Sequence, residues 1–69
     1  MTLEYDKITD SLSIKFRTAD IEETDEIRPG VLLDVDENNE MVSLEILNAS
    51  NKVDSLEAIV INSKKVVVD

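Results

Sequence analysis

Cysteine, histidine and tryptophan are absent from this 69-residue sequence, and glycine and proline occur once each. Without cysteine the chain has no disulfide and no thiolate metal ligand. Without histidine it lacks the side chain that most often acts as general base or metal ligand near neutral pH, and its serines have no histidine to activate them. We therefore expect a protein that is not an enzyme and holds no cofactor.

Basic residues are scarce as well. Seven Lys and Arg stand against 16 Asp and Glu, which gives a formal net charge of −9. A field of this sign repels nucleic acids and anionic membrane surfaces, so we expect neither as a partner. It suits a basic protein, although an acidic surface also serves solubility alone. Because the sequence shows no signal peptide and no apolar run of about 18 residues, we expect a soluble cytoplasmic protein.

The length predicts one small domain over residues 1–69. Chains of this size bury only about 60% of the surface that they expose when unfolded, so their stability is marginal without additional support. Disulfides and thiolate-bound metals are excluded here. We therefore expect self-association, as a homodimer, to supply part of the stability.

Alternating apolar and polar residues near the start predict a first β-hairpin. The alternation runs over residues 2–6 and again over residues 11–17. A four-residue loop between them sets Tyr5 opposite Leu12 and places the apolar residues of both arms on one face. Asp and Thr within this loop suit a turn, because their side chains bond to nearby backbone groups.

The segment that follows carries a run of acidic residues within a weak strand pattern. The acids are Asp20, Glu22, Glu23, Asp25 and Glu26. Strict alternation counted back from Ile27 would put two of them on the core face, which a bulge or a position at the sheet edge would resolve. We predict a short, irregular strand over residues 21–27.

Residues 31–47 predict the main hairpin, and Pro29-Gly30 predicts the turn that leads into it. A shared apolar face requires paired residue numbers that sum to 77: Val31 with Ile46, Leu33 with Leu44, and Val35 with Val42. A two-residue loop at Asn38-Asn39 and a four-residue loop both preserve these pairs. A slip of one residue would turn every apolar side chain to the wrong face, so the register is strongly specified.

The C-terminal third leaves two structures open. Asp54 followed by Glu57 resembles a helix capping box, which favours a short helix over residues 54–60 and then a strand over 65–68. The β-branched run at 59–61 allows a second hairpin instead. The sequence as a whole predicts a mainly β protein, with a single curled antiparallel meander of about five strands and a short C-terminal helix or extra strand.

Several short segments of the chain resemble a known family. They are EYD at 4–6, TDSLSI at 9–14, EET at 22–24, GVLLD at 30–34 and VSLEILNAS at 42–50. Together they are similar to the bacterial and archaeal family named domain of unknown function 2283. The resemblance covers residues 3–50 as a β core and leaves 51–69 as a variable C-terminal segment. It implies a compact β-rich fold and brings no activity, catalytic residue or ligand.

The tip of the main hairpin has a spacing that is found in calcium loops. Asp34, Asp36 and Asn38 occupy the first, third and fifth positions, and Glu45 occupies the twelfth. The sixth position is Asn39, where such a loop needs Gly, and the flanking periodicity is that of strands. The predicted register sets Glu45 opposite Leu32, away from the tip, so we expect at most weak cation binding there.

Three functional hypotheses follow. The first is a non-enzymatic β-rich module for self-association or protein binding, through apolar residues on the second face of the main hairpin and their neighbour: Leu32, Met41, Leu47 and Glu45. The second is an acidic, antitoxin-like partner that neutralises a basic toxin or nuclease through Asp20, Glu22, Glu23, Asp25 and Glu26. The third is weak metal-ion binding at the acidic hairpin tip.

Overall fold

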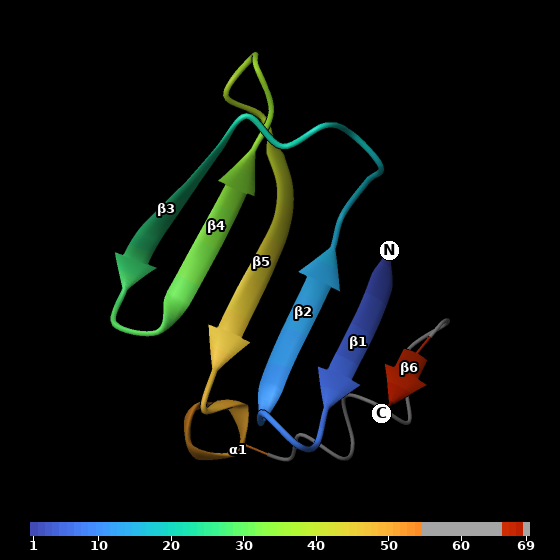
Figure 1. The fold of residues 1–69 in the computed structure, drawn as a ribbon, viewed down its shortest axis with the longest axis vertical. Coiled ribbons are helices and arrows are strands. Elements are labelled where there is room, and N and C mark those ends of the chain that lie inside the picture. The colour runs from blue at the N-terminus through green and yellow to red at the C-terminus, as the bar shows by residue number, and fades with distance from the viewer. Residues whose placement is uncertain (55–65, 69) are drawn as a thin grey trace.

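One twisted sheet contains every strand in the described part of the chain (Figure 1). The structure is a computed structural model that describes residues 1–54 and 66–68. Its elements are β1 (Thr2–Asp6), β2 (Ser11–Lys15), β3 (Glu23–Arg28), β4 (Val31–Val35), β5 (Met41–Leu47), α1 (Ala49–Lys52) and β6 (Val66–Val68). The strand order is β3-β4-β5-β2-β1-β6, in which β6 runs parallel to β1 and all other neighbours are antiparallel. The mainly β class and the five-stranded antiparallel sheet are confirmed.

The first hairpin has the predicted register. Tyr5 pairs with Leu12 and Leu3 pairs with Ile14 across β1 and β2. In the loop between them, the Asp6 carboxylate accepts hydrogen bonds from the backbone nitrogens of the two residues that follow Lys7, at 2.9 and 3.4 Å. This is the local side-chain bonding that makes Asp a good turn residue.

The chain does not follow a simple meander between β2 and β3. It leaves β2 and crosses the ends of β5 and β4 to reach the far edge of the sheet, and then returns strand by strand until β5 pairs with β2 (Figure 1). The crossover is hydrogen-bonded to the strands that it passes, from Phe16 N to Val42 O at 2.9 Å and from Glu22 N to Val35 O at 2.8 Å. The strands β3, β4 and β5 follow one another as hairpins, and β2, which a long connection joins to β3, lies beside β5; this is the strand order of a Greek key.

Strand β3 lies at the sheet edge, as its acidic sequence indicated. It begins at Glu23 and ends at Arg28, and its pairing with β4 contains a bulge between Glu26 and Arg28. Ile27 is the extra residue, and at 44% exposure it does not face the core, so its inward placement was wrong. The acids upstream of the bulge keep the regular alternation, and their edge position leaves them in solvent.

The main hairpin has the predicted residue pairs except near its tip. Val31 pairs with Ile46 and Leu33 with Leu44, but Val35 pairs with Met41, so the predicted partner of Val35 was wrong. A bulge causes the shift. The loop is closed by a hydrogen bond from Asp36 N to Glu40 O, which leaves three residues between them, and Asn39 adopts a left-handed φ of 63°. A three-residue loop with a left-handed third residue is a common hairpin connection that brings a bulge with it.

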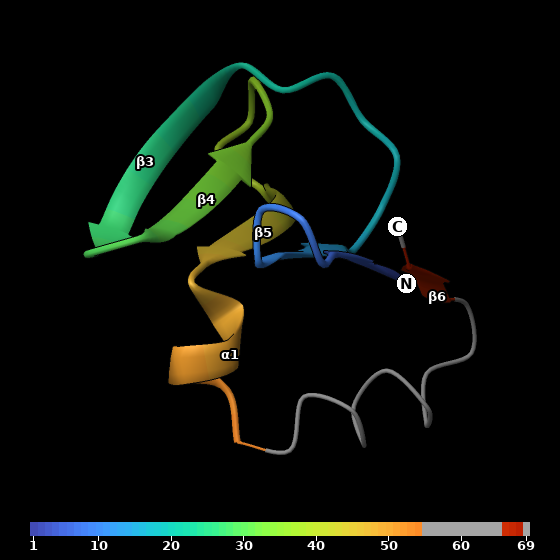
Figure 2. The same cartoon turned by 60° about the horizontal axis from the view of Figure 1, so that its bottom comes forward.

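The core lies between the sheet and α1, which covers one face of it (Figure 2). We call this the inner face. Leu3, Leu12 and Ala49 are buried there, and Tyr5, Ile14, Ile46 and Val53 pack against them. Val35 and Val42 are also buried, near the crossover. The alternation over residues 11–17 also places Phe16 on the core face, but its side chain is 40% exposed, so this placement was wrong.

The helix occupies a position that the sequence did not indicate. α1 comprises Ala49–Lys52, whereas the helix predicted over 54–60 falls, apart from its first residue, outside the described residues. The predicted strand over 65–68 is confirmed at Val66–Val68, which extends the sheet beside β1. Among the residues described, no helix has the length and apolar character to cross a membrane.

Candidate partner-binding surfaces

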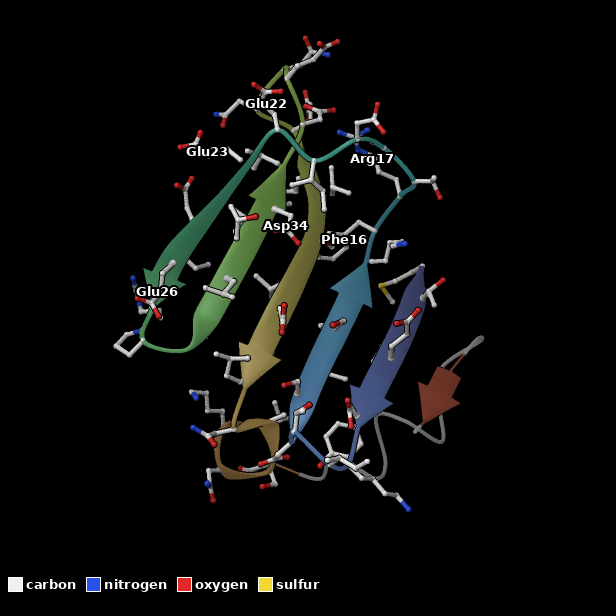
Figure 3. The ribbon with its side chains drawn as sticks, in the orientation of Figure 1. Phe16, Arg17, Glu22, Glu23, Glu26 and Asp34 are labelled. Carbon is white, nitrogen blue, oxygen red and sulfur yellow. The ribbon has the colours of Figure 1, made fainter. Side chains whose placement is uncertain are left out.

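The five predicted acidic contact residues lie together at one border of the sheet. We call this group the acidic edge: Asp20, Glu22, Glu23, Asp25 and Glu26. Asp20 and Glu22 belong to the end of the crossover, and the other three belong to β3. All five are exposed, and Figure 3 shows Glu22, Glu23 and Glu26 along this border. The structure therefore brings the predicted contact residues together.

Register divides the side chains of β3 between the two faces. Glu23 pairs with Val35 and Asp25 pairs with Leu33, so these two carboxylates continue the inner face beyond its last apolar strand. Glu26 pairs with Leu32, on the opposite face. Its carboxylate accepts a hydrogen bond from Gly30 N at 3.2 Å. The acidic edge thus presents negative charge to both sides of the sheet.

Little positive charge offsets the acidic edge. Residues 1–54 contain one ion pair, between Arg17 and Asp36 at the hairpin tip. The guanidinium of Arg28, on β3 itself, donates a hydrogen bond to the backbone oxygen of the preceding residue, Ile27, at 2.9 Å. The carboxylates of the acidic edge therefore face solvent without a basic side chain bound to them in the described part of the chain.

The second predicted surface is only partly assembled. Leu32 pairs with Glu45 across β4 and β5, and Leu47 lies two residues further along β5 on the same face. These three side chains are half-buried on the outer face, the one opposite α1. Met41 lies at the other end of β5, beyond the bulge, and is 55% exposed. The structure groups Leu32, Glu45 and Leu47 and separates Met41 from them.

A shallow hollow of about 300 Å³ lies at the β1–β2 end of the outer face. Its lining consists mostly of carboxylates and hydroxyls: Glu4, Asp6 and Glu45, with Tyr5, Thr9, Ser11 and Ser13. Ligand pockets in proteins are usually lined by apolar and aromatic side chains with a few polar groups. This hollow has the reverse composition, so it is a poor site for an apolar ligand.

At the hairpin tip, the Asp36 carboxylate stabilises the loop through hydrogen bonds. Asp36 accepts hydrogen bonds from the backbone nitrogens of Asn38 and Glu40, at 2.9 and 3.0 Å, and from Arg17. The Arg17 hydrogen bond is the main reason why the pKa of Asp36 is lowered. Glu45 pairs with Leu32, as predicted, and so lies away from the tip. Among the residues described, no three acidic side chains are arranged to hold a metal ion.

One polar junction was not predicted. The Asp10 carboxylate accepts hydrogen bonds from Tyr5 Oη at 2.7 Å, Ser50 Oγ at 2.6 Å and Ser50 N at 3.1 Å. Asp10 O also accepts one from Ala49 N at 2.9 Å. The Ser50 hydroxyl and then the Tyr5 hydroxyl lower the pKa of Asp10, and the bond to Asp10 raises the pKa of Tyr5. Asp10, with a left-handed φ of 54°, thereby ties the first loop to the start of α1.

Spacing could not have revealed this junction, because Asp10 and Ser50 are 40 residues apart. The sequence pattern sets Tyr5 opposite Leu12 on the core face and indicates only a turn role for Asp10. The available signal was the family resemblance, since all three residues fall within the segments that carry it. The junction joins residues from three of these segments.

A family model described as "Protein of unknown function (DUF2283)" matches residues 2–50. The chain belongs to this family. The matched region extends from the start of β1 into α1 and includes both hairpins, the acidic edge and the Asp10 junction. No curated protein and no solved structure gives a significant match. The family's description names no function, so the candidate functions rest on the surfaces of the molecule.

Proposed function

We propose that this protein is a non-enzymatic interaction module that binds a basic protein partner through the acidic edge. One observation carries the proposal: all five carboxylates of the acidic edge are exposed along an edge strand and the crossover before it. Within the described residues none of them is bound to a basic side chain. Strong local charge of one sign is what recognises a partner of the opposite sign.

The net charge of the whole chain also favours a basic partner. A net charge of −9 on 69 residues attracts a basic protein from a distance and speeds its encounter with the acidic edge. Salt screens such attraction over about 10 Å at 0.1 M. Binding should therefore weaken steeply as ionic strength rises. The class of partner that we favour is a basic toxin or nuclease, whose phosphate-binding surface the carboxylates would occupy in an antitoxin-like complex.

The test compares two charge-reversed variants of equal net charge. E23K/D25K alters the acidic edge, whereas E37K/E40K alters exposed acids at the hairpin tip. Each variant is immobilised beside the wild type, exposed to native lysate at low salt and eluted with a salt gradient. We expect a basic protein that the wild type and E37K/E40K retain and E23K/D25K releases. Equal retention by all three proteins would contradict the assignment of the acidic edge.

Self-association is a second candidate function. The buried apolar side chains among the described residues are only five, Leu3, Leu12, Val35, Val42 and Ala49. A core this small favours further burial between copies, and Leu32 and Leu47 on the outer face offer apolar surface for it. Sedimentation equilibrium of the wild type and of Leu32→Asp tests this: we expect a wild-type dimer that the substitution dissociates. A wild-type protein that stays monomeric at millimolar concentration would exclude it.

A further inference from the structure

The geometry points to strand addition as the way in which the partner binds: an extended, Lys- or Arg-rich segment pairs with the outer side of β3. This inference rests on the proposed function and specifies the shape of the partner. Two features of β3 support it together, the open backbone edge and the sign of the side-chain charges along that edge.

The outer side of β3 pairs with no other strand in the described part of the chain. Among the described strands, β3 ends the strand order and has β4 as its one neighbour (Figure 1), and all six of its residues are exposed. Every second residue of such a strand directs its backbone N–H and C=O outward, where they can pair with another strand. Peptides that bind in this way gain affinity from main-chain hydrogen bonds.

The usable part of this edge is short. The pairing of β3 with β4 is regular from Glu23 to Glu26 and shifts at the bulge before Arg28. A bulge increases the local twist and bends the strand, so it ends a regular ladder. At this end the Arg28 guanidinium also donates a hydrogen bond to Ile27 O. The added segment therefore pairs with residues 23–26 and has no basic residue beside Arg28.

Charge decides which strand can occupy the edge. Opposite charges in directly paired positions stabilise a sheet, and like charges destabilise it. A second copy of β3, added antiparallel about Thr24, would set Glu23 opposite Asp25 on the same face and so place acid against acid. A basic segment instead places Lys or Arg opposite Glu23 and Asp25 on one face. The edge thus excludes its own copy and accepts a basic partner.

The experiment uses a capped seven-residue peptide in which lysine alternates with threonine, titrated into the ¹⁵N-labelled full chain at low salt. We expect chemical-shift changes and slower amide exchange in residues 23–26. A matched peptide of the same sequence, with its central backbone nitrogens methylated, keeps the charge but loses the donors of the ladder. It should bind roughly tenfold more weakly or worse.

The outcomes separate this inference from the proposed function. Equal binding of the two peptides, lost in E23K/D25K and kept in E37K/E40K, would overturn strand addition and leave an electrostatic acidic edge intact. Binding of neither peptide, with a basic protein still retained from lysate by the acidic edge, would also overturn strand addition alone. Binding of neither peptide and no such retained protein would overturn both.

Discussion

Strands β2 and β3 have almost the same length but are stabilised by different interactions. β2 lies between β1 and β5, and its Leu12 is 1% exposed in the core beside α1. Among the described strands, β3 has one neighbour, and all of its residues are exposed. Apolar burial therefore holds β2, whereas backbone pairing with β4 holds β3. Because the side chains of β3 contribute little to the core, they can be charged without burying a charge, and the acidic edge can form there.

Truncation of one apolar side chain in each strand should give the largest difference between them. Leu12→Ala removes a side chain at the centre of the core and should cost about 3 kcal/mol of the free energy of unfolding. Ile27→Ala, at the exposed bulge of β3, should cost no more than about 0.5 kcal/mol. Urea denaturation at neutral pH measures both. Similar losses would mean that β3 shares the core after all.

Gly30 connects the two regions, and its replacement should have the next largest effect. It adopts a φ of +76° between β3 and β4, and its carbonyl accepts a hydrogen bond from Leu47 N at 2.8 Å. A Cβ here would lie 2.8 Å from Lys52 Nζ, the flexible end of a side chain, so backbone strain dominates the cost. Gly30→Ala should lose about 1–2 kcal/mol of unfolding free energy.

Gly30→Asn is the matched control for this strain. Asn tolerates the left-handed conformation better than Ala does, so it should destabilise the protein less despite its larger side chain. Thermal unfolding of the two variants side by side decides the point. A larger loss for Asn than for Ala would show that crowding at Lys52, and not the backbone angle, governs this turn.

The Asp10 junction should make the free energy of unfolding depend on pH. Because its pKa is lowered in the folded protein, ionised Asp10 stabilises the fold at pH values above its unfolded pKa of about 4. That stabilisation is lost as the pH falls through the lower, folded-state pKa. Asp10→Asn should therefore be less stable than the wild type at pH 7, and the difference should shrink below pH 4. Urea unfolding at both pH values measures it, and a constant difference would contradict this origin.

Charge reversal at the edge should change stability least of all. E23K/D25K replaces two exposed side chains of β3 that contact no basic group in the described part of the chain, so its unfolding free energy should stay within about 0.5 kcal/mol of the wild type. Circular dichroism and urea denaturation check this before any binding assay. Unfolding of E23K/D25K would show that β3 contributes more to the fold than its exposure indicates.

The sequence predicted those parts of the fold that depend on alternation. Leu12 and Tyr5 pair as their periodicity required, and Leu33 pairs with Leu44. Periodicity does not encode the order of strands in a sheet, so it could not reveal that the chain crosses from β2 to the far edge. The bulge near Val42 follows from the left-handed Asn39 in the turn, and a conformation of one residue leaves no periodic pattern.

The candidate surfaces were predicted to different degrees for a related reason. The position of the acidic edge could be predicted from the sequence, because a weak strand pattern with five acids is stable only at an exposed border of a sheet. Met41 was grouped with Leu32 by counting along a regular hairpin, and the bulge placed it elsewhere. The Asp10 junction depends on a contact across 40 residues, which only the assembled fold reveals.

The same contact sets the order in which the molecule can assemble. A helix of four residues has too few internal hydrogen bonds to persist alone. The carboxylate that receives its first-turn N–H and hydroxyl belongs to the loop that closes the N-terminal hairpin. α1 can therefore form only after that hairpin has closed and β5 has docked beside it. On a ribosome the first hairpin can close before Ser50 has emerged, whereas α1 and then β6, which follow it in the sequence, join it later.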